Sequence, residues 1–153
     1  MKFPYRSYEV SVTPASGGDS GYIYRPIIPF ALTGPNGTLD FYGLLDTGAD
    51  ETYLTRQMAE RLGLEVLEES DCIIESASGE MSVSYASVTI EVSEGVEIHQ
   101  WRTTVGITDQ DWAEAILGHS GFLQYFDILF CGNDLKLEIT RNDSTLPTET
   151  DGL

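Results

Sequence analysis

The sequence predicts an all-β domain with one or two short helices. Runs of residues in which apolar and polar side chains alternate follow one another along the chain, and clusters rich in Gly, Pro, Asn and Ser separate them. Only one short segment, residues 55–64, has apolar side chains at helical spacing. With 153 residues, of which 41% are hydrophobic, the chain is long enough for one domain with its own core.

The first expected strand spans residues 3–12, and the segment 16–21 after it is rich in Gly and Ser. Such a composition predicts a flexible connector. We therefore interpret residues 1–21 as an N-terminal arm outside the central core, which pairs either with a second subunit or within its own subunit. The next strand, 22–32, contains two prolines, which force an edge position or a break.

A turn of Gly, Pro, Asn and Gly at 34–37 predicts a hairpin, whose second strand, 38–45, ends at Asp46. The helical segment follows after a short acidic loop. Thr55 can cap its start, and Gly63 marks its end. Its apolar face consists of Met58, Ala59 and Leu62.

Residues 72–92 contain two apolar-rich runs and predict a long β-hairpin with Gly79 near its tip. A further strand is expected at 98–107. The polar turn 109–114 then leads into a short apolar stretch.

A final hairpin is expected over residues 126–139, and the polar residues after it lack any periodicity. We therefore divide the chain into the arm at 1–21, a central domain at 22–140 and a loose C-terminal tail at 141–153. No internal repeat is visible.

The chain is strongly acidic, with a formal net charge of -17 from 25 acidic and 8 basic residues. This field repels phosphate backbones, so nucleic acid is not an expected partner. An acidic surface is compatible with basic substrates, but more often it serves solubility.

Cysteine and histidine are too few, and too far apart, for a disulfide framework or a metal site: Cys72, Cys131, His99 and His119. No run reaches the ~18 apolar residues of a membrane helix, and residues 1–6 lack the apolar core of a signal peptide. A cytoplasmic protein that does not associate with membranes is therefore expected.

Residues 41–54 combine a short apolar run with an acidic turn. Asp46 is a poor strand residue, and Thr47 and Gly48 directly after it favour reversal of the backbone. This pattern presents a carboxylate on a loop held by buried strands, which is a common way to present a reactive group. The alternative is that Asp46 only caps a turn, as most Asp-x-Gly triplets do.

The segment 44–52, Leu-Leu-Asp-Thr-Gly-Ala-Asp-Glu-Thr, closely resembles the active-site segment of retroviral-type aspartic proteases, the retropepsins. A second signature of this family is two apolar residues and a glycine that open a short helix. Ile116, Leu117 and Gly118 match it, and the chain continues through 119–123 as His-Ser-Gly-Phe-Leu.

The resemblance covers roughly residues 22–140 and implies a retropepsin-like closed β structure, the acid-protease fold. The helix expected at 55–64 is more like cellular and bacterial members of the family than compact viral ones.

The resemblance also implies roles for single residues. Asp46 would be catalytic, Thr47 would form hydrogen bonds across a dimer axis, and Gly48 would offer its carbonyl to the substrate backbone. Ala49 would line a side-chain pocket, and Asp50 would accept hydrogen bonds from the substrate backbone. For Thr47, the alternative is a turn residue that satisfies its own hydroxyl.

The hairpin at 72–92 would be the flap that folds over a bound peptide, with Ser78 and Gly79 contacting the substrate; the alternative is an ordinary surface hairpin. In viral relatives an arginine follows the second glycine and braces the residue equivalent to Asp50. His119 stands there in this chain, and it can act so only when protonated or as a hydrogen-bond donor. A plain structural role for His119 is the alternative.

Peptide hydrolysis by carboxylates needs two of them at one water, one as base and one as acid. The chain contains a single Asp-Thr-Gly, and Asp50 lies too close along the same turn to be the partner. A dyad therefore requires Asp46 from each of two subunits. The expected function is a homodimeric aspartic endopeptidase that acts on peptides or proteins without metal or cofactor.

Two other functions remain open at this point. One is a peptide-binding or dimerisation module of the same fold without turnover. The other is a domain of a larger assembly, with residues 1–21 as a docking strand.

Overall fold

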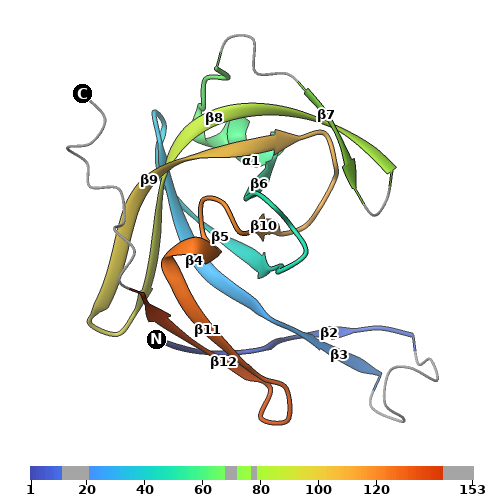
Figure 1. Cartoon of the computed structure of the whole chain (residues 1–153), viewed down its shortest axis with the longest axis vertical. Helices are drawn as coiled ribbons and strands as arrows, with labels where there is room; N and C mark the ends of the chain where they lie inside the picture. Colours follow the sequence, from blue (N-terminus) through green and yellow to red (C-terminus); the bar gives the residue numbers. More distant parts are fainter. Residues whose placement is uncertain (12–20, 68–71, 77–78, 143–153) are drawn as a thin grey trace.

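Twelve strands, one α-helix and one short 3₁₀-helix make up the part of the chain that the computed structural model describes, residues 1–11, 21–67, 72–76 and 79–142 (Figure 1). The strands are β1 (Lys2–Pro4), β2 (Arg6–Glu9), β3 (Tyr22–Arg25), β4 (Ile27–Gly34), β5 (Gly37–Leu45), β6 (Tyr53–Thr55), β7 (Cys72–Ser76), β8 (Gly79–Glu94), β9 (Glu97–Thr108), β10 (Ala115–Leu117), β11 (Phe126–Cys131) and β12 (Lys136–Arg141). The helices are α1 (Arg56–Leu62) and the 3₁₀-helix η1 (Leu123–Tyr125). The predicted fold class, all-β with one or two short helices, is confirmed.

The largest sheet closes on itself. Its order is β4-β5-β10-β6-β9-β8-β7, and β4 also pairs with β8, so β4, β5, β10, β6, β9 and β8 form a ring. Two contacts in this ring are parallel, β5 with β10 and β6 with β9, and the others are antiparallel. Strand β7 lies outside the ring as the partner of β8. Closure leaves the ring without an open edge along its paired parts.

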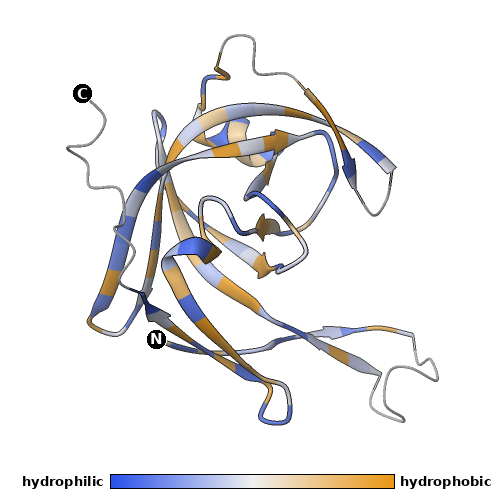
Figure 2. Cartoon of the chain, viewed as in Figure 1, coloured by the Kyte–Doolittle hydropathy of each residue, from blue (hydrophilic) through white to orange (hydrophobic). Residues whose placement is uncertain are grey.

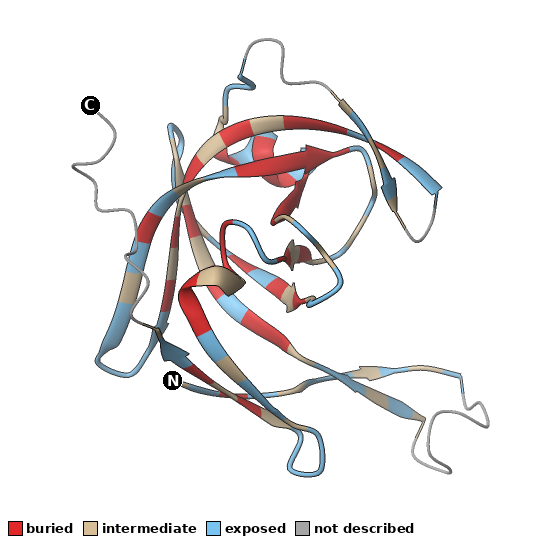
Figure 3. Ribbon diagram, viewed as in Figure 1, coloured by how far each residue is buried: buried red, intermediate tan, exposed pale blue. Residues whose placement is uncertain are grey.

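Because the closed ring encloses a core, hydrophobic and hydrophilic residues alternate along its strands. Figure 2 shows hydrophobic and hydrophilic residues alternating along much of β8 and β9, and Figure 3 shows that many of the hydrophobic ones are buried. At one end of the core, the fully buried Trp101 packs against three aromatic rings with centroids 5.4–5.8 Å away: Phe122, Tyr125 and Phe126. Its indole N–H donates to the Gly121 carbonyl at 2.9 Å, so the cluster also fixes the turn before η1.

The predicted helix is confirmed. The Thr55 hydroxyl accepts a hydrogen bond from the Met58 N–H at 3.3 Å, and Gly63 ends α1 in the left-handed conformation. The residues predicted for its apolar face are buried: Met58, Ala59 and Leu62. The predicted hairpins β4–β5, β7–β8 and β11–β12 are also present.

The expectation of one strand at 3–12 is wrong, because the chain changes partner at Tyr5. Strand β1 pairs with β12, and Phe3 is buried in the main core. Strand β2 pairs with β3 instead. The Tyr5 N–H donates to the Leu135 carbonyl at 2.7 Å, which marks the change. Alternation alone cannot reveal a change of partner. Within the arm, β1 therefore places Phe3 in the core, whereas β2 pairs only with β3.

The predicted strand at 22–32 divides at Pro26 into β3 and β4. Pro29 stays within β4, outside the part of that strand that pairs with β8. Most of the predicted connector, most of the tail and the site residue Ser78 lie outside the described residues. The domain boundaries stay predictions.

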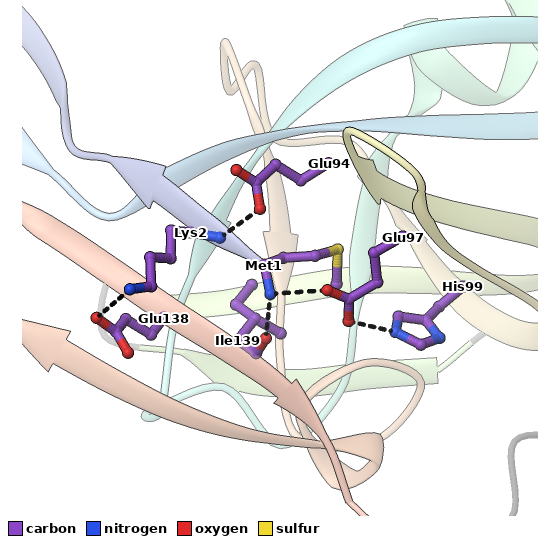
Figure 4. A network of polar contacts seen from close by, with 7 residues as sticks. All are labelled: Met1, Lys2, Glu94, Glu97, His99, Glu138 and Ile139. Carbon is purple, nitrogen blue, oxygen red and sulfur yellow. Dashed lines mark hydrogen bonds and ion pairs between the residues drawn. The ribbon is translucent and has the colours of Figure 1, made fainter.

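A polar network ties β1 to the β8–β9 hairpin and to β12 (Figure 4). The Met1 ammonium donates to Glu97 Oε2 at 3.1 Å and to the Ile139 carbonyl at 2.9 Å, and His99 Nε2 lies 3.0 Å from Glu97 Oε1. The hydrogen bond with His99 and then the one from the Met1 ammonium lower the pKa of the Glu97 carboxyl. The Lys2 N–H also donates to Glu94 Oε2 at 2.9 Å. No helix in the described ranges has the length and apolar character needed to cross a membrane.

Candidate active site

The loop that carries Asp46 joins two strands that are not neighbours. Strand β10 lies between β5 and β6, parallel to β5 and antiparallel to β6. The connection from Asp46 to Thr52 therefore passes the end of β10. The Asp46 N–H donates to the Leu117 carbonyl at 3.2 Å, and the Leu45 N–H donates to the Pro26 carbonyl at 3.0 Å. Asp46 thus follows directly on β5, which is hydrogen-bonded to β4 on one side and to β10 on the other.

Gly118 is the point where the loop and the second signature meet. A Cβ there would collide with the Glu51 carbonyl oxygen and would lie 2.8 Å from the Ala49 carbonyl oxygen. Only glycine permits so close an approach of two backbones. Two N–H groups that follow bind the loop: His119 to the Ala49 carbonyl at 2.9 Å, and Ser120 to the Asp50 carbonyl at 2.8 Å. The structure thus brings both sequence signatures together.

The Asp46 carboxylate is half-buried. Its Oδ1 accepts a hydrogen bond from the Gly48 N–H at 2.9 Å, and the Ala49 N–H donates to the Asp46 carbonyl at 3.2 Å. A Cβ at Gly48 would lie 3.2 Å from Oδ1, so glycine gives this carboxylate room to turn back onto the loop. Thr47 is exposed on the same turn. The local structure therefore fixes one carboxylate oxygen.

A cavity of about 650 Å³ opens beside this carboxylate. Three groups of residues line it: the loop with β6 and β10, the β7–β8 hairpin, and Trp112. The lining residues are Asp46, Gly48, Ala49, Asp50, Glu51, Tyr53, Ile74, Glu75, Ser76, Met81, Tyr85, Trp112 and Ile116. The wall therefore combines apolar and aromatic side chains with four carboxylates, and it has the size of a small-molecule or peptide side-chain site.

A contact that the sequence did not reveal connects the hairpin to the loop. Glu51 Oε2 accepts hydrogen bonds from the Tyr85 hydroxyl of β8 at 2.8 Å and from the Tyr53 hydroxyl at 3.2 Å. Burial, followed by the hydrogen bonds and charge of Glu51, raises the pKa of both phenols, so both remain protonated donors. Glu51 lies within the family-like segment, but no pattern indicated its partners.

Comparison with known proteins decides the family. The family profile of the gag-polyprotein putative aspartyl protease matches residues 35–124, which is more than half of the chain. The chain belongs to the retropepsin-like aspartyl protease family. The matched range includes both the Asp46 loop and Gly118.

Two solved structures illustrate the likeness of this retropepsin-like chain. The retropepsin-like aspartic protease from Rickettsia conorii is 17% identical with a TM-score of 0.51, covers 74% of this chain and is itself covered to 89%, which shows a shared fold. EIAV protease complexed with the inhibitor HBY-793 is 26% identical with a TM-score of 0.49, and the match covers 62% of this chain and 82% of that one. Comparison with curated proteins gave no match.

The predicted site residues fall into two groups in this family member. Asp46, Gly48, Ala49, Asp50 and Ile116 line the cavity. The remaining predicted residues among those described are not part of its lining: Leu117 is fully buried, Gly118 contacts the loop, Thr47 and His119 are exposed, and Gly79 lies at the hairpin tip. The expected short helix after the second signature is reduced to the three residues of η1.

His119 contacts the loop through its backbone. Its backbone N–H donates to Ala49, and across the described residues no hydrogen bond or ion pair joins its imidazole to the Asp50 carboxylate. The backbone of residues 118–120 holds the loop instead. A bracing role for the imidazole stays a prediction.

Proposed function

We propose that this retropepsin-like chain is an aspartic endopeptidase that works as a homodimer, with Asp46 from each subunit forming the catalytic dyad. The observation that carries the proposal is the position of the Asp46 carboxylate at the wall of the cavity, with one oxygen held by Gly48. A single carboxylate supplies only one of the two proton-transfer roles. Because the sequence contains one Asp-Thr-Gly, the second carboxylate comes from a second copy.

The proposed reaction needs no group beyond the two carboxylates and a water. Two carboxyl groups at roughly 3 Å share one proton, which is established behaviour for aspartic-protease dyads. The ionised carboxylate takes a proton from the water, whose oxygen attacks the peptide carbonyl carbon, while the other carboxyl donates its proton to the carbonyl oxygen. Return of a proton to the amide nitrogen then breaks the C–N bond and releases an amine and an acid.

The cavity suits an extended peptide. Ile74, Met81, Trp112 and Ile116 offer apolar surface for side chains, and Ala49 lies among them. Asp50 would accept hydrogen bonds from the peptide backbone. The β7–β8 hairpin, which supplies one wall, would act as the flap over the bound peptide. Four carboxylates in the wall oppose binding of nucleic acid. We place this activity in the cytoplasm.

A proteome digest tests the function. The purified protein is incubated with a denatured mixed proteome between pH 4 and 7, and new peptide termini are identified by mass spectrometry. Asp46→Asn is the control, because it keeps the shape of the side chain and removes its proton-transfer role. We expect new termini from the wild type only, with at least a ~10⁴-fold loss of rate in the variant, since both roles come from this residue.

The same experiment separates enzyme from binding module. If the wild type releases no peptides at any pH at which it is dimeric, it is a peptide-binding or dimerisation module of the same fold. If Asp46→Asn cleaves as fast as the wild type, another residue carries the chemistry. Equal thermal stability of the two proteins would show that the variant differs in chemistry and not in folding.

A further inference from the structure

A second cavity, of about 360 Å³, shares one side chain with the cavity beside Asp46. The indole of Trp112 belongs to the lining of both. The rest of the second cavity is formed by β5, the end of β6, α1 and the loop between β9 and β10. Of the described residues that line the two cavities, only Trp112 is common to both, so the second cavity is a separate space with one shared wall.

The shared side chain is held by packing. The loop that carries Trp112 is anchored near its two ends, where the Arg56 Nε–H donates to Asp109 Oδ1 at 2.9 Å and Glu114 accepts a hydrogen bond from β2. Within the described part of the chain, the indole N–H of Trp112 has no acceptor. Its ring packs against the apolar cluster around Met81 on the side of the Asp46 cavity. The position of the ring therefore depends on what fills the two cavities.

The second cavity presents two opposite charges that do not neutralise each other. The Arg61 guanidinium lies 5.1 Å from the centroid of the Phe41 ring, a contact that favours its position at the cavity wall. Among the described residues, no carboxylate forms an ion pair with Arg61, and no cation forms one with Asp111. A guanidinium binds a carboxylate through two parallel hydrogen bonds, and a carboxylate accepts hydrogen bonds from an ammonium. The cavity thus offers one partner for each end of a zwitterion.

Apolar surface and net charge narrow the class of ligand further. Phe41, Met58 and Trp112 line the same space as the two charges, so they can pack against apolar side chains. A purely anionic ligand is repelled by a chain of net charge -17, and a purely cationic one is repelled by Arg61. A zwitterion without net charge avoids both repulsions. The volume lies at the small end of the range for ligand sites, which suits an amino acid or a dipeptide.

We propose that the second cavity binds short peptides with free termini and apolar side chains, and that Trp112 couples this binding to the Asp46 cavity. Arg61 binds the carboxylate of the ligand and Asp111 binds its ammonium. A ligand packed on one side of the indole favours ring positions toward the Asp46 cavity, which narrows the space for substrate.

The binding site stands without the proposed function, but its effect on cleavage rests on that function. Hydrolysis of a peptide bond creates one new carboxylate and one new ammonium. The products of the proposed enzyme therefore belong to the class of ligand that the second cavity selects. Short products would raise KM and so slow further cleavage when substrate is scarce.

Titration of the full chain with leucyl-leucine, followed by NMR, tests the site. The two tryptophans give two indole N–H signals, and Trp101 is fully buried with its N–H bonded to the Gly121 carbonyl. We expect the Trp112 signal to shift and the Trp101 signal to stay, with a dissociation constant of about 1 mM or lower. Trp112→Phe assigns the two signals.

Changes to the ligand and to the protein identify the two charged contacts. N-acetyl-leucyl-leucine lacks the ammonium and leucyl-leucinamide lacks the carboxylate, so each should bind at least about tenfold more weakly than leucyl-leucine. Arg61→Gln should weaken leucyl-leucine by a similar factor and the amide much less, because the amide has no carboxylate to lose. Asp111→Asn should do the same toward leucyl-leucine and the acetylated probe. Glu75→Gln is the control, because Glu75 lines only the Asp46 cavity, and it should bind like the wild type.

Three results would overturn the binding site. They are the absence of a saturable shift in the wild type, equal binding by wild type and Arg61→Gln, and a loss of binding in Glu75→Gln but not in Arg61→Gln, which would place the dipeptide in the Asp46 cavity. Should a variant fail to fold, the two blocked probes decide on the wild type alone, and equal affinity of all three probes contradicts the site. None of these measurements needs turnover, so such a failure leaves the proposed function intact.

The coupling is tested separately, with the peptide cleavage assay. Saturating leucyl-leucine should raise KM at least about threefold with kcat changed less, and Arg61→Gln should abolish this rise. An unchanged KM would show that the second cavity binds without effect on the first. A wild type that binds leucyl-leucine but cleaves nothing in the proteome digest would remove the proposed function and the regulation together.

Discussion

The Asp46 loop and the β7–β8 hairpin line the same cavity, but different forces hold them. The loop is fixed by backbone hydrogen bonds from Asp46, His119 and Ser120, and by the close approach of Gly118. The hairpin pairs through β8 and reaches the loop through the Tyr85 side chain and Glu51. In the proposed enzyme the reacting carboxylate would gain from a preorganised position, whereas a wall that admits substrate would have to open. We therefore expect the backbone hydrogen bonds of the loop to persist when the Tyr85–Glu51 side-chain contact of the hairpin breaks.

The largest effect is expected where the backbone contact is broken. Gly118→Ala puts a Cβ against the Glu51 and Ala49 carbonyls, so we expect a loss of at least about 3 kcal/mol in the free energy of unfolding, together with loss of activity. Urea denaturation measures this. Gly132→Ala is the matched control, because a Cβ there meets nothing within 4 Å. Equal stability of the two variants would mean that the loop tolerates displacement.

Breaking the side-chain contact should cost less. In Glu51→Ala both phenols lose their acceptor, and we expect stability to fall by about 1–2 kcal/mol and KM to rise, with kcat changed less. Glu51→Gln keeps an acceptor oxygen and should lose less than about 1 kcal/mol. Glu80→Ala, an exposed carboxylate on β8, serves as the control. A large fall in kcat without a change in KM would show that Glu51 supports the chemistry and not the hairpin.

Alkaline titration examines the same contact without mutation of Glu51. The pKa of Tyr53 and of Tyr85 is raised in the folded protein, so their contribution to stability is fully present below pH ~10 and is lost as pH rises through the folded pKa. Absorbance at the phenolate band should show these two tyrosines ionising after the exposed ones. Tyr53→Phe with Tyr85→Phe should reduce this late step to Tyr8, whose pKa is raised to about 12 by burial and by Glu114, and should lessen the loss of stability above pH 10. A late step of unchanged size in the double variant would contradict the assignment.

The smallest effect on stability is expected at the Glu97 network. None of its residues lines the cavity, so it serves as a comparison for the two contacts above. The pKa of Glu97 is lowered by His99 and the Met1 ammonium, so its contribution is present above pH ~4.3 and is lost as pH falls through the folded pKa. Because the carboxylate is exposed, Glu97→Gln should lower the midpoint of thermal unfolding only slightly at pH 7, and not at all at pH 3. Activity should not change. A loss of activity would show that this network communicates with the cavity.

Sequence reasoning succeeded where local chemistry decides structure. Thr55 and Gly63 bound a helix, Gly34 and Gly37 close a hairpin, and two short signatures identified the family. The close approach of Gly118 to the loop was not predicted from the sequence. The order of the strands in the ring could not be predicted from the sequence, because β10 inserts between strands that are distant from it along the chain.

Other features left no local signal. The change of partner at Tyr5 conserves the alternation on both sides, so one strand and two strands look alike in sequence. The hydrogen bond between Tyr85 and Glu51 joins residues 34 positions apart, and it depends on the position of the β7–β8 hairpin relative to the loop. The pairing of β2 with β3 depends on a register that a run of four residues does not specify.

The insertion of β10 between β5 and β6 also constrains how the protein can be made. Residues 37–55 leave the ribosome long before residues 115–118, yet the gap between the two earlier strands is filled only by the later one. Contacts so distant in sequence form slowly, and domains of this size are synthesised over seconds. A nascent chain shorter than residue 118 therefore cannot hold Asp46 in its final position. The proposed proteolytic activity would therefore be absent until residues 115–118 have been added to the chain.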